Sequence, residues 1–289
     1  MPEVVKVDKV EKLDQLERPP SRLGRVLTSP LRAADSVLAA AVRFFQVVGE
    51  VITLAAQTFV WAVRPPYRLK LLAEQMEFVG VGSLSIVILT SAFTGAVIAV
   101  QTIFNLAKFR QEALYLAGAA LALARELSPV LGALMVTARA GSAMATELGT
   151  MRITEQIEAM ATMAVSPVHY LVMPRVLATI VMMPALVMVF NGVGISGAYL
   201  LGVYAFGVDP GPALENFRFF TDPADIYMGL VKSLVFGLIL SVISCYNGYN
   251  AAGGAKGVGT ATTRSVVWSS VAILIFDYLI TDLMTERLA

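Results

Sequence analysis

The sequence predicts an all-α integral membrane protein with five membrane-spanning helices. Of its 289 residues, 57% are hydrophobic and only 15% are charged, and the mean hydropathy is +0.71, more apolar than is usual for a soluble chain of this length. Five long stretches are also apolar enough to cross a hydrocarbon core about 30 Å thick, which takes about 20 residues of helix. Both observations indicate a multi-pass membrane protein.

The N-terminal 72 residues are not expected to cross the membrane. Residues 1–32 alternate charges and lack the apolar core of a signal peptide, which predicts a solvated cytoplasmic tail. Residues 33–72 predict an interfacial amphipathic helix and a linker. One polar stripe runs along this helix, formed by Arg43, Gln46, Glu50, Thr53 and Gln57. Its uncharged run, residues 51–63, has only 13 residues; the alternative is a sixth, tilted span.

The five predicted spans make up one membrane domain, residues 73–289. They are residues 78–107, 113–146, 176–208, 226–251 and 265–284. The first and third carry no charged residue. The others contain Arg125, Glu126 and Arg139 in the second, Lys232 in the fourth, and Asp277 and Asp282 in the fifth.

The distribution of Lys and Arg predicts a cytoplasmic N-terminus. Cytoplasmic segments carry an excess of Lys and Arg in the short loops beside the spans. With the N-terminus inside, the cytoplasmic residues are Arg64, Arg68, Lys70, Arg152, Arg175, Lys256 and Arg264, against Lys108, Arg110, Arg218 and Arg287 outside. The loop between the second and third spans is then cytoplasmic, and the loop before the fourth is extracytoplasmic.

Several kinds of chemistry are disfavoured. A net charge of +1 without clustered basic residues argues against nucleic-acid binding. One cysteine (Cys245) and one histidine (His169) cannot form a disulfide or a usual metal site. The glycine-rich stretch 248–260 has Gly254 where a phosphate loop needs Lys, so we expect no ATP binding by this chain alone. We predict no catalytic residue, metal or cofactor.

Arg125 and Glu126 are the first candidate functional residues. An unpaired charge near the middle of a span costs at least about 2.5–3.5 kcal/mol, so both need a polar environment. Pro129 frees the carbonyl of Arg125 and predicts a break in the helix there. Two interpretations stay open at this stage: contact with a lipid headgroup or a gating ion pair, and a structural bridge to Asp277 or Asp282.

Small residues later in the second span predict a helix-packing face. They are Ala138, Gly141, Ser142, Ala145 and Gly149, three or four residues apart, which lets another helix approach closely. The partner could be another helix of this chain or a second copy.

The loop between spans two and three predicts an amphipathic helix of about four turns. Its apolar positions are Ile153, Ile157, Met160, Ala161 and Ala164, and its polar positions are Thr154, Glu155, Glu158 and Thr162. Helices that float on anionic lipid usually carry a basic face. The acidic face here favours a protein partner.

Four motifs at fixed distances in this region are ARAGSA (138–143), ELGTM (147–151), TEQ (154–156) and PR (174–175). Through them, residues 125–178 closely resemble the MlaE/YrbE permeases, the membrane subunits of ABC transporters that work with MCE proteins. Residues 247–284 resemble the same family, and residues 74–102 do so more weakly. The resemblance covers about residues 73–284, although the glycine-rich turn AAGGAKGVG departs from the family pattern.

The resemblance implies a homodimer in the bacterial inner membrane that carries phospholipid or a similar amphiphile. It implies a cytoplasmic ATPase that touches a coupling helix between spans two and three, and an extracytoplasmic MCE ring; a small accessory protein on the ATPase is a further candidate partner. The coupling residues would be Thr154, Glu155, Gln156 and Glu158, and the residues of the lipid pathway would be Arg125, Glu126 and Gln101.

Two other functions remain open from the residues alone. A proton-coupled secondary transporter could use Glu126, Asp277 or Asp282. A structural membrane scaffold is the other, and it should tolerate the loss of Arg125 and Glu126 together.

Overall fold

The computed structural model describes residues 22–65 and 68–288, and its regular structure in these ranges is entirely helical. The all-α prediction is confirmed for this part of the chain. By its contacts the chain divides into two units, Met1–Ile52 and Thr53–Ala289, and each is considered by itself. The predicted tail up to residue 21 lies outside the described residues.

Helix α2 (Arg22–Val63) corresponds to the predicted interfacial helix but starts eleven residues earlier than expected. It ends directly before Arg64-Pro65, as expected because a proline disfavours the helical conformation of the residue before it. Its part in the second unit buries only Leu54 and Thr58 among residues 53–63. The polar residues Gln46, Glu50 and Gln57 of the predicted stripe are exposed.

Six helical segments of the described chain are long and apolar enough to cross a membrane. They are Phe44–Val63, Leu69–Ala107, Glu112–Ile153, Val168–Ala205, Pro223–Tyr249 and Gly254–Met284. The last five correspond to the five predicted spans, although the third and fourth predictions end a few residues too late, at residues 208 and 251 instead of Ala205 and Tyr249. Phe44–Val63, within α2, is the sixth, so length and composition alone also allow the alternative of a spanning α2.

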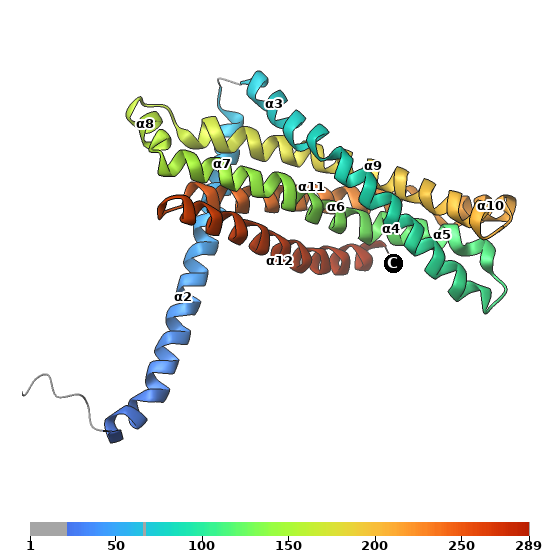
Figure 1. Cartoon of the computed structure of the whole chain (residues 1–289), viewed down its shortest axis with the longest axis horizontal. Helices are drawn as coiled ribbons and strands as arrows, with labels where there is room; N and C mark the ends of the chain where they lie inside the picture. Colours follow the sequence, from blue (N-terminus) through green and yellow to red (C-terminus); the bar gives the residue numbers. More distant parts are fainter. Residues whose placement is uncertain (1–21, 66–67, 289) are drawn as a thin grey trace, which may run out of the picture. The chain divides into compact units, whose positions relative to one another are not determined.

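The long helices of the second unit run side by side (Figure 1). Helix α4 (Val81–Ala107) packs on α9 (Met173–Leu200), and α9 packs on α11 (Pro223–Tyr249). Helix α11 also contacts α12 (Gly254–Leu288) and α7 (Ser142–Ile153). Helix α3 (Leu69–Val79) leads into α4 through a joint at Gly80.

The second predicted span is one continuous run of helix that two π-turns make irregular. It comprises η1 (Glu112–Leu114), α5 (Tyr115–Ala122), the π-turn η2 (Leu123–Leu127), α6 (Ser128–Val136), the π-turn η3 (Thr137–Gly141) and α7. The break predicted near Arg125 is not an interruption of the helix; the irregularity there is the π-turn η2. Pro129 lies two residues after this π-turn, inside the continuous helix, and has no N–H to donate to the preceding turn.

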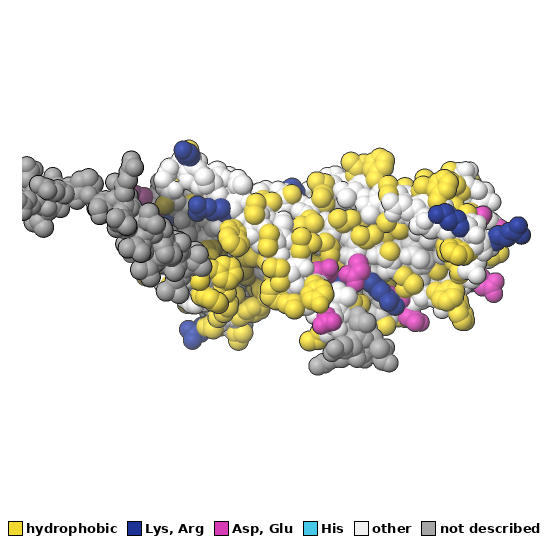
Figure 2. Space-filling model, turned by 90° about the horizontal axis from the view of Figure 1, so that it is seen from below, with side chains coloured by type: hydrophobic (Ala, Val, Ile, Leu, Met, Phe, Trp, Pro, Cys, Tyr) yellow, Lys and Arg dark blue, Asp and Glu magenta, His cyan; other side chains and the backbone are white. Residues whose placement is uncertain are grey.

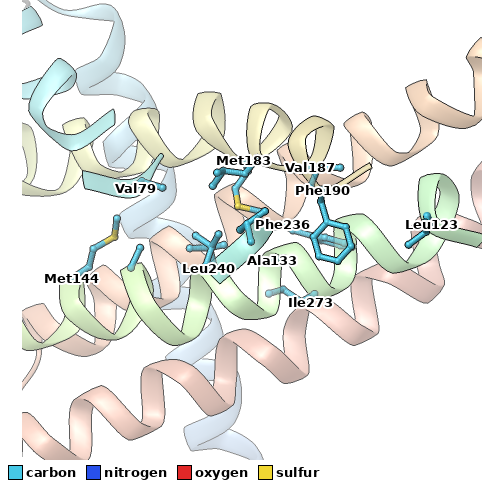
Figure 3. Packing of buried hydrophobic residues seen from close by; sticks show 14 residues of the cluster. Val79, Leu123, Ala133, Met144, Met183, Val187, Phe190, Phe236, Leu240 and Ile273 are labelled. Carbon is cyan, nitrogen blue, oxygen red and sulfur yellow. The ribbon is translucent and has the colours of Figure 1, made fainter. Parts of the chain in front are cut away.

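Buried apolar side chains from all the long helices of the second unit form one core (Figure 3). Phe190 and Met183 of α9 meet Phe236 and Leu240 of α11, with Ile273 of α12 beside them. Dense packing of this kind fixes how each helix is rotated about its axis. That rotation decides which charged side chains can meet inside the bundle.

The outer surface of the bundle is largely apolar. Apolar side chains are spread along the described part of the face seen in Figure 2, and acidic and basic side chains lie together near its middle and again at its right-hand end. On α12 the large exposed apolar residues are Val267, Trp268, Val271, Leu274, Ile275, Phe276, Tyr278, Leu279 and Leu283. A surface of this kind is suited to contact with lipid or with another apolar helix face.

The two ends of the bundle differ. Helix α8 (Gln156–Thr162) lies at one end, and α10 (Pro210–Phe220) lies at the other (Figure 1). The third predicted span runs between them, from the π-turn η4 (Val168–Val172) through α9 to the π-turn η5 (Leu201–Ala205). Arg152 therefore lies at the opposite end from Arg218, as the orientation argument requires.

The amphipathic helix predicted after the second span is shorter than expected. Helix α8 has seven residues, about two turns, and the prediction of about four turns is wrong. The backbone of Glu155 and of Ala164 is left-handed, with φ of 59° at each. These two residues separate α8 from the helices on either side.

Candidate functional site

Arg125 is bound by an aspartate that sequence reasoning did not single out. Its Nε and Nη2 both lie 2.6 Å from Oδ1 of Asp225, in the first turn of α11. The other carboxylate oxygen of Asp225 accepts a hydrogen bond from the backbone N–H of Asp222, at 3.0 Å. The Asp225 side chain is 5% exposed, whereas the Arg125 side chain is 51% exposed. The guanidinium is therefore held on one side and open on the other.

Glu126 is bound by Lys232, which also binds a second carboxylate. Nζ of Lys232 lies 2.5 Å from Oε2 of Glu126 and 2.9 Å from Oδ1 of Asp277. The hydroxyl of Thr281 lies 3.4 Å from Oε1 of Glu126. The Lys232 side chain is fully buried, and that of Glu126 is 41% exposed. One ammonium group thus lies within ion-pair distance of two carboxylates on two other helical elements.

Arg125, Glu126, Asp225, Lys232 and Asp277 are referred to below as the ion-pair cluster. Neighbouring residues point about 100° apart on a helix, which is why Arg125 and Glu126 reach different partners. Both are bridged to other spans, as one of the two interpretations expected. Their remaining exposure also leaves room for a polar ligand.

Two members of the cluster, Asp225 and Lys232, were missed as site residues. Lys232 was visible as the single charge in an otherwise uncharged span, and its buried cation demanded an acidic partner. Asp225 directly precedes the fourth predicted span, residues 226–251, so it was assigned to the loop and not to the membrane. Asp282, offered as a partner for Arg125 and Glu126, is exposed and makes no ion pair with any described residue.

Gln101 does not join this cluster. Its side chain is exposed on α4, and no hydrogen bond connects it with a cluster residue in the described chain.

The predicted coupling residues lie at and around α8. Thr154, Glu155 and Gln156 are exposed, and Glu158 forms an ion pair with Arg152 of α7. Of the predicted apolar positions, Ile157 is buried and Met160 is half-buried, whereas Ala161 and Ala164 are exposed. Glu155 is thus the acidic side chain of this segment that remains available to a partner.

The predicted packing residues contact other helices of the same chain. A Cβ at Gly141 would lie 2.9 Å from Oγ of Ser244, and one at Gly149 would lie 3.3 Å from Ala251 and Val258. The backbone of Ala145 approaches Gly248 equally closely. These contacts bring α7 against α11 and the start of α12.

Arg139 ties the second span to the joint between α3 and α4. Its guanidinium donates to the carbonyl oxygen of Phe78 and to the hydroxyl of Ser83, and it lies 4.8 Å from the centre of the Phe78 ring. A Cβ at Gly82 would overlap the guanidinium, so a larger residue there would displace the Arg139 side chain from its present contacts. This arginine was visible only as a charge that interrupts a span.

His169, the single histidine, stacks on Trp61 at the end of α2, with ring centres 5.0 Å apart. Arg64 lies over the same Trp61 ring. This stack gives His169 a packing contact with the end of α2.

A bundle of long apolar helices with ion pairs between its spans defines a multi-pass membrane protein of the permease class. The chain belongs to the MlaE permease family, whose family model, "Permease MlaE", matches residues 72–283. The resemblance noted from the sequence motifs is thereby confirmed.

The relatives extend this result over most of the chain. The chain is 44% identical to the "Probable ABC transporter permease protein" of Rickettsia felis over 253 residues, 88% of this chain and 98% of that protein. It is 37% identical to the "Intermembrane phospholipid transport system permease protein MlaE" of Haemophilus influenzae over 217 residues, 74% of this chain and 82% of that protein. It is also 37% identical to the chloroplast protein TRIGALACTOSYLDIACYLGLYCEROL 1 of Arabidopsis thaliana, over 72% of this chain and 60% of that protein.

These findings establish the general function of the chain. The chain is an ABC-type permease subunit, a non-catalytic component of a transporter, and a multi-pass protein of the inner membrane.

Proposed function

We propose that this chain moves phospholipid, or a similar amphiphile, between the inner membrane and an extracytoplasmic MCE protein. Its family membership and the phospholipid transport named for the Haemophilus influenzae relative support this function. The observation that carries it furthest is the half-exposed Arg125 in the ion-pair cluster. Asp225 occupies one edge of this guanidinium and leaves its other N–H groups for an anionic headgroup.

The proposed assembly contains two copies of this chain, a cytoplasmic ABC ATPase with an optional accessory protein, and an MCE protein outside. In this arrangement five helices span the membrane, and α2 lies in the cytoplasmic interface with the N-terminus inside. The exposed polar stripe of α2 (Gln46, Glu50 and Gln57) and the low burial of its C-terminal part support an interfacial helix. The coupling helix is α8, with Thr154, Glu155, Gln156 and Glu158 as its contact region.

Lipid contact at the cluster is tested by photocrosslinking. A crosslinking amino acid at Arg125 or Glu126 is expected to capture phospholipid in the assembled transporter, more strongly than one at Leu89, which is exposed on the outside of α4. The physical reason is that a lipid in the pathway has a longer residence time than bulk lipid on an outer apolar surface. Mass spectrometry of the adducts gives the result. Labelling confined to protein neighbours at both positions would assign the cluster to structure alone.

Contact with the ATPase is tested by reversing charge at α8. The double change Glu155→Lys with Gln156→Lys is expected to reduce co-purification of the ATPase at least about tenfold, the equivalent of roughly 1.4 kcal/mol of binding free energy. Glu158 is left intact because it already pairs with Arg152.

A matched control for this change exists at the opposite end of the bundle. Gln111 and Glu112 are adjacent and exposed, so Gln111→Lys with Glu112→Lys introduces the same charge without touching α8. The control is expected to co-purify the ATPase like the wild type. Equal losses in both variants, or none in either, would remove α8 as the contact.

The proton-coupled alternative has less support. Glu126 and Asp277, two of its candidate acids, are both bound to Lys232. Lipid transfer by the reconstituted complex with ATP and no proton gradient separates the two, since a secondary transporter would show none.

A further inference from the structure

A second ion pair lies at the base of the segment that connects spans two and three. Nη2 of Arg175, in the first turn of α9, lies 2.9 Å from Oε2 of Glu147 on α7. The Arg175 side chain is only 8% exposed, whereas the Glu147 side chain is 49% exposed. The pair therefore joins the helix that enters the segment, residues 154–167, to the helix that leaves it.

Helix packing alone does not explain why the Arg175 guanidinium is buried. Its Nη1 is buried and has no hydrogen-bond partner among the described residues, so the guanidinium is incompletely satisfied. A buried ion pair seldom stabilises helix packing more than well-packed apolar side chains do, because both charges must be removed from water. The small residues of α7, among them Ala145 and Gly149, already provide close packing against α11 and α12. A specific tie between α7 and α9 is the property that the ion pair adds.

A second tie attaches α8 to the same body. Arg152, in the last turn of α7, forms an ion pair with Glu158 of α8, and Ile157 of α8 is buried. A displacement of α8 is thus passed to α7 through the ion pair between Glu158 and Arg152, and from α7 to α9 through Glu147. Without the Glu147–Arg175 pair, α7 and α9 could separate at the base of the segment and absorb the displacement.

We propose that Glu147 and Arg175 are positioning residues that lock α7, α8 and α9 into one lever, so that movement of α8 turns both spans together. The proposal rests on the proposed function, because it assigns the push on α8 to the ATPase. Neither residue touches the transported lipid in this scheme. Their loss should uncouple transport from ATP hydrolysis rather than stop hydrolysis.

The test uses the complete transporter reconstituted in vesicles, with lipid transfer and ATP hydrolysis measured in parallel. Glu147→Gln is the informative single variant, because the half-exposed side chain can be neutralised without opening a cavity. We expect ATP hydrolysis within twofold of the wild type and at least a tenfold fall in lipid transferred per ATP. The charge-exchanged double variant Glu147→Arg with Arg175→Glu should recover transfer to within about threefold. Glu112→Gln, an exposed glutamate at the other end of the bundle, is the matched control and should change neither rate.

The outcomes separate this proposal from the proposed function. A wild-type complex without ATP-driven lipid transfer would overturn the proposed function itself. Transfer per ATP unchanged in Glu147→Gln would overturn the lever, and so would a parallel fall of hydrolysis and transfer, which indicates a purely structural role. A charge-exchanged variant that assembles normally but recovers no transfer would also overturn it.

Discussion

Replacement of Lys232 with Met is expected to destabilise the protein more than the loss of any other cluster residue. The Lys232 side chain is fully buried and lies within ion-pair distance of two carboxylates, Glu126 and Asp277. Removing one partner from a buried ion pair costs about 3–5 kcal/mol, because the remaining charge has lost its counter-charge. That is a large part of the roughly 5–15 kcal/mol by which folded proteins are stable. We expect a strongly reduced yield of folded protein and no lipid transfer.

Substitution of Glu126 and Asp277 tests whether their unpaired carboxylates cause the loss of stability. Glu126 is 41% exposed and Asp277 is 21% exposed, so solvent reduces the share of Glu126, and Asp277 should carry more of the penalty. In the Lys232→Met background, Asp277→Asn combined with Glu126→Gln should therefore recover the melting midpoint in detergent. Lys108→Met, at an exposed position, is the control for loss of a lysine. A Lys232→Met protein that melts like the wild type would show that these carboxylates find other partners.

The spans could be found from the sequence because apolar length is a local property. Each of the five predicted spans coincides, apart from a few residues at its end, with a helical segment that is long and apolar enough to cross a membrane. The helix ends were less accessible. Helix α3 already starts at Leu69 and includes Glu74 and Glu77, because a helix continues past the point where its side chains cease to be apolar.

The length of α8 could not be read from periodicity. Its apolar spacing correctly marks Ile157 as buried, but the helix is interrupted where Glu155 adopts a left-handed backbone. Glutamate is a good helix former, so no local signal marks this interruption. The turn forms because α7 and α9 must be brought back side by side, which is a demand of the tertiary structure.

Only part of the ion-pair cluster could be predicted from the sequence. The cost of charge in lipid singled out Arg125 and Glu126, and the angle between neighbouring residues showed that they need different partners. Their partners Asp225 and Lys232 are 100 and 106 residues away in the chain. Such pairings depend on how each helix is rotated in the bundle. One sequence contains little information about that rotation.

Gly95→Ala is expected to separate α4 from α9. A Cβ at Gly95 would overlap the carbonyl oxygen of Gly194 and lie 2.7 Å from its carbonyl carbon and 2.8 Å from its Cα. All three are backbone atoms of α9, so no side chain can rotate away to make room. Overpacking of this kind costs about 1–3 kcal/mol and sometimes more. We expect a lower melting midpoint and a loss of lipid transfer, because α4 would no longer follow α9.

Gly192→Ala is the matched control on α9 itself. A Cβ at Gly192 meets no atom within 4 Å, although the residue lies only two positions from Gly194. In a helix interior, alanine is favoured over glycine by about 0.8–1.0 kcal/mol, so this variant should melt at or slightly above the wild-type midpoint. The opposite signs of the two substitutions separate close helix contact from helix propensity. Equal midpoints for Gly95→Ala and Gly192→Ala would mean that α4 and α9 are not in backbone contact at Gly95, and transfer of movement from α9 to α4 would then need another route.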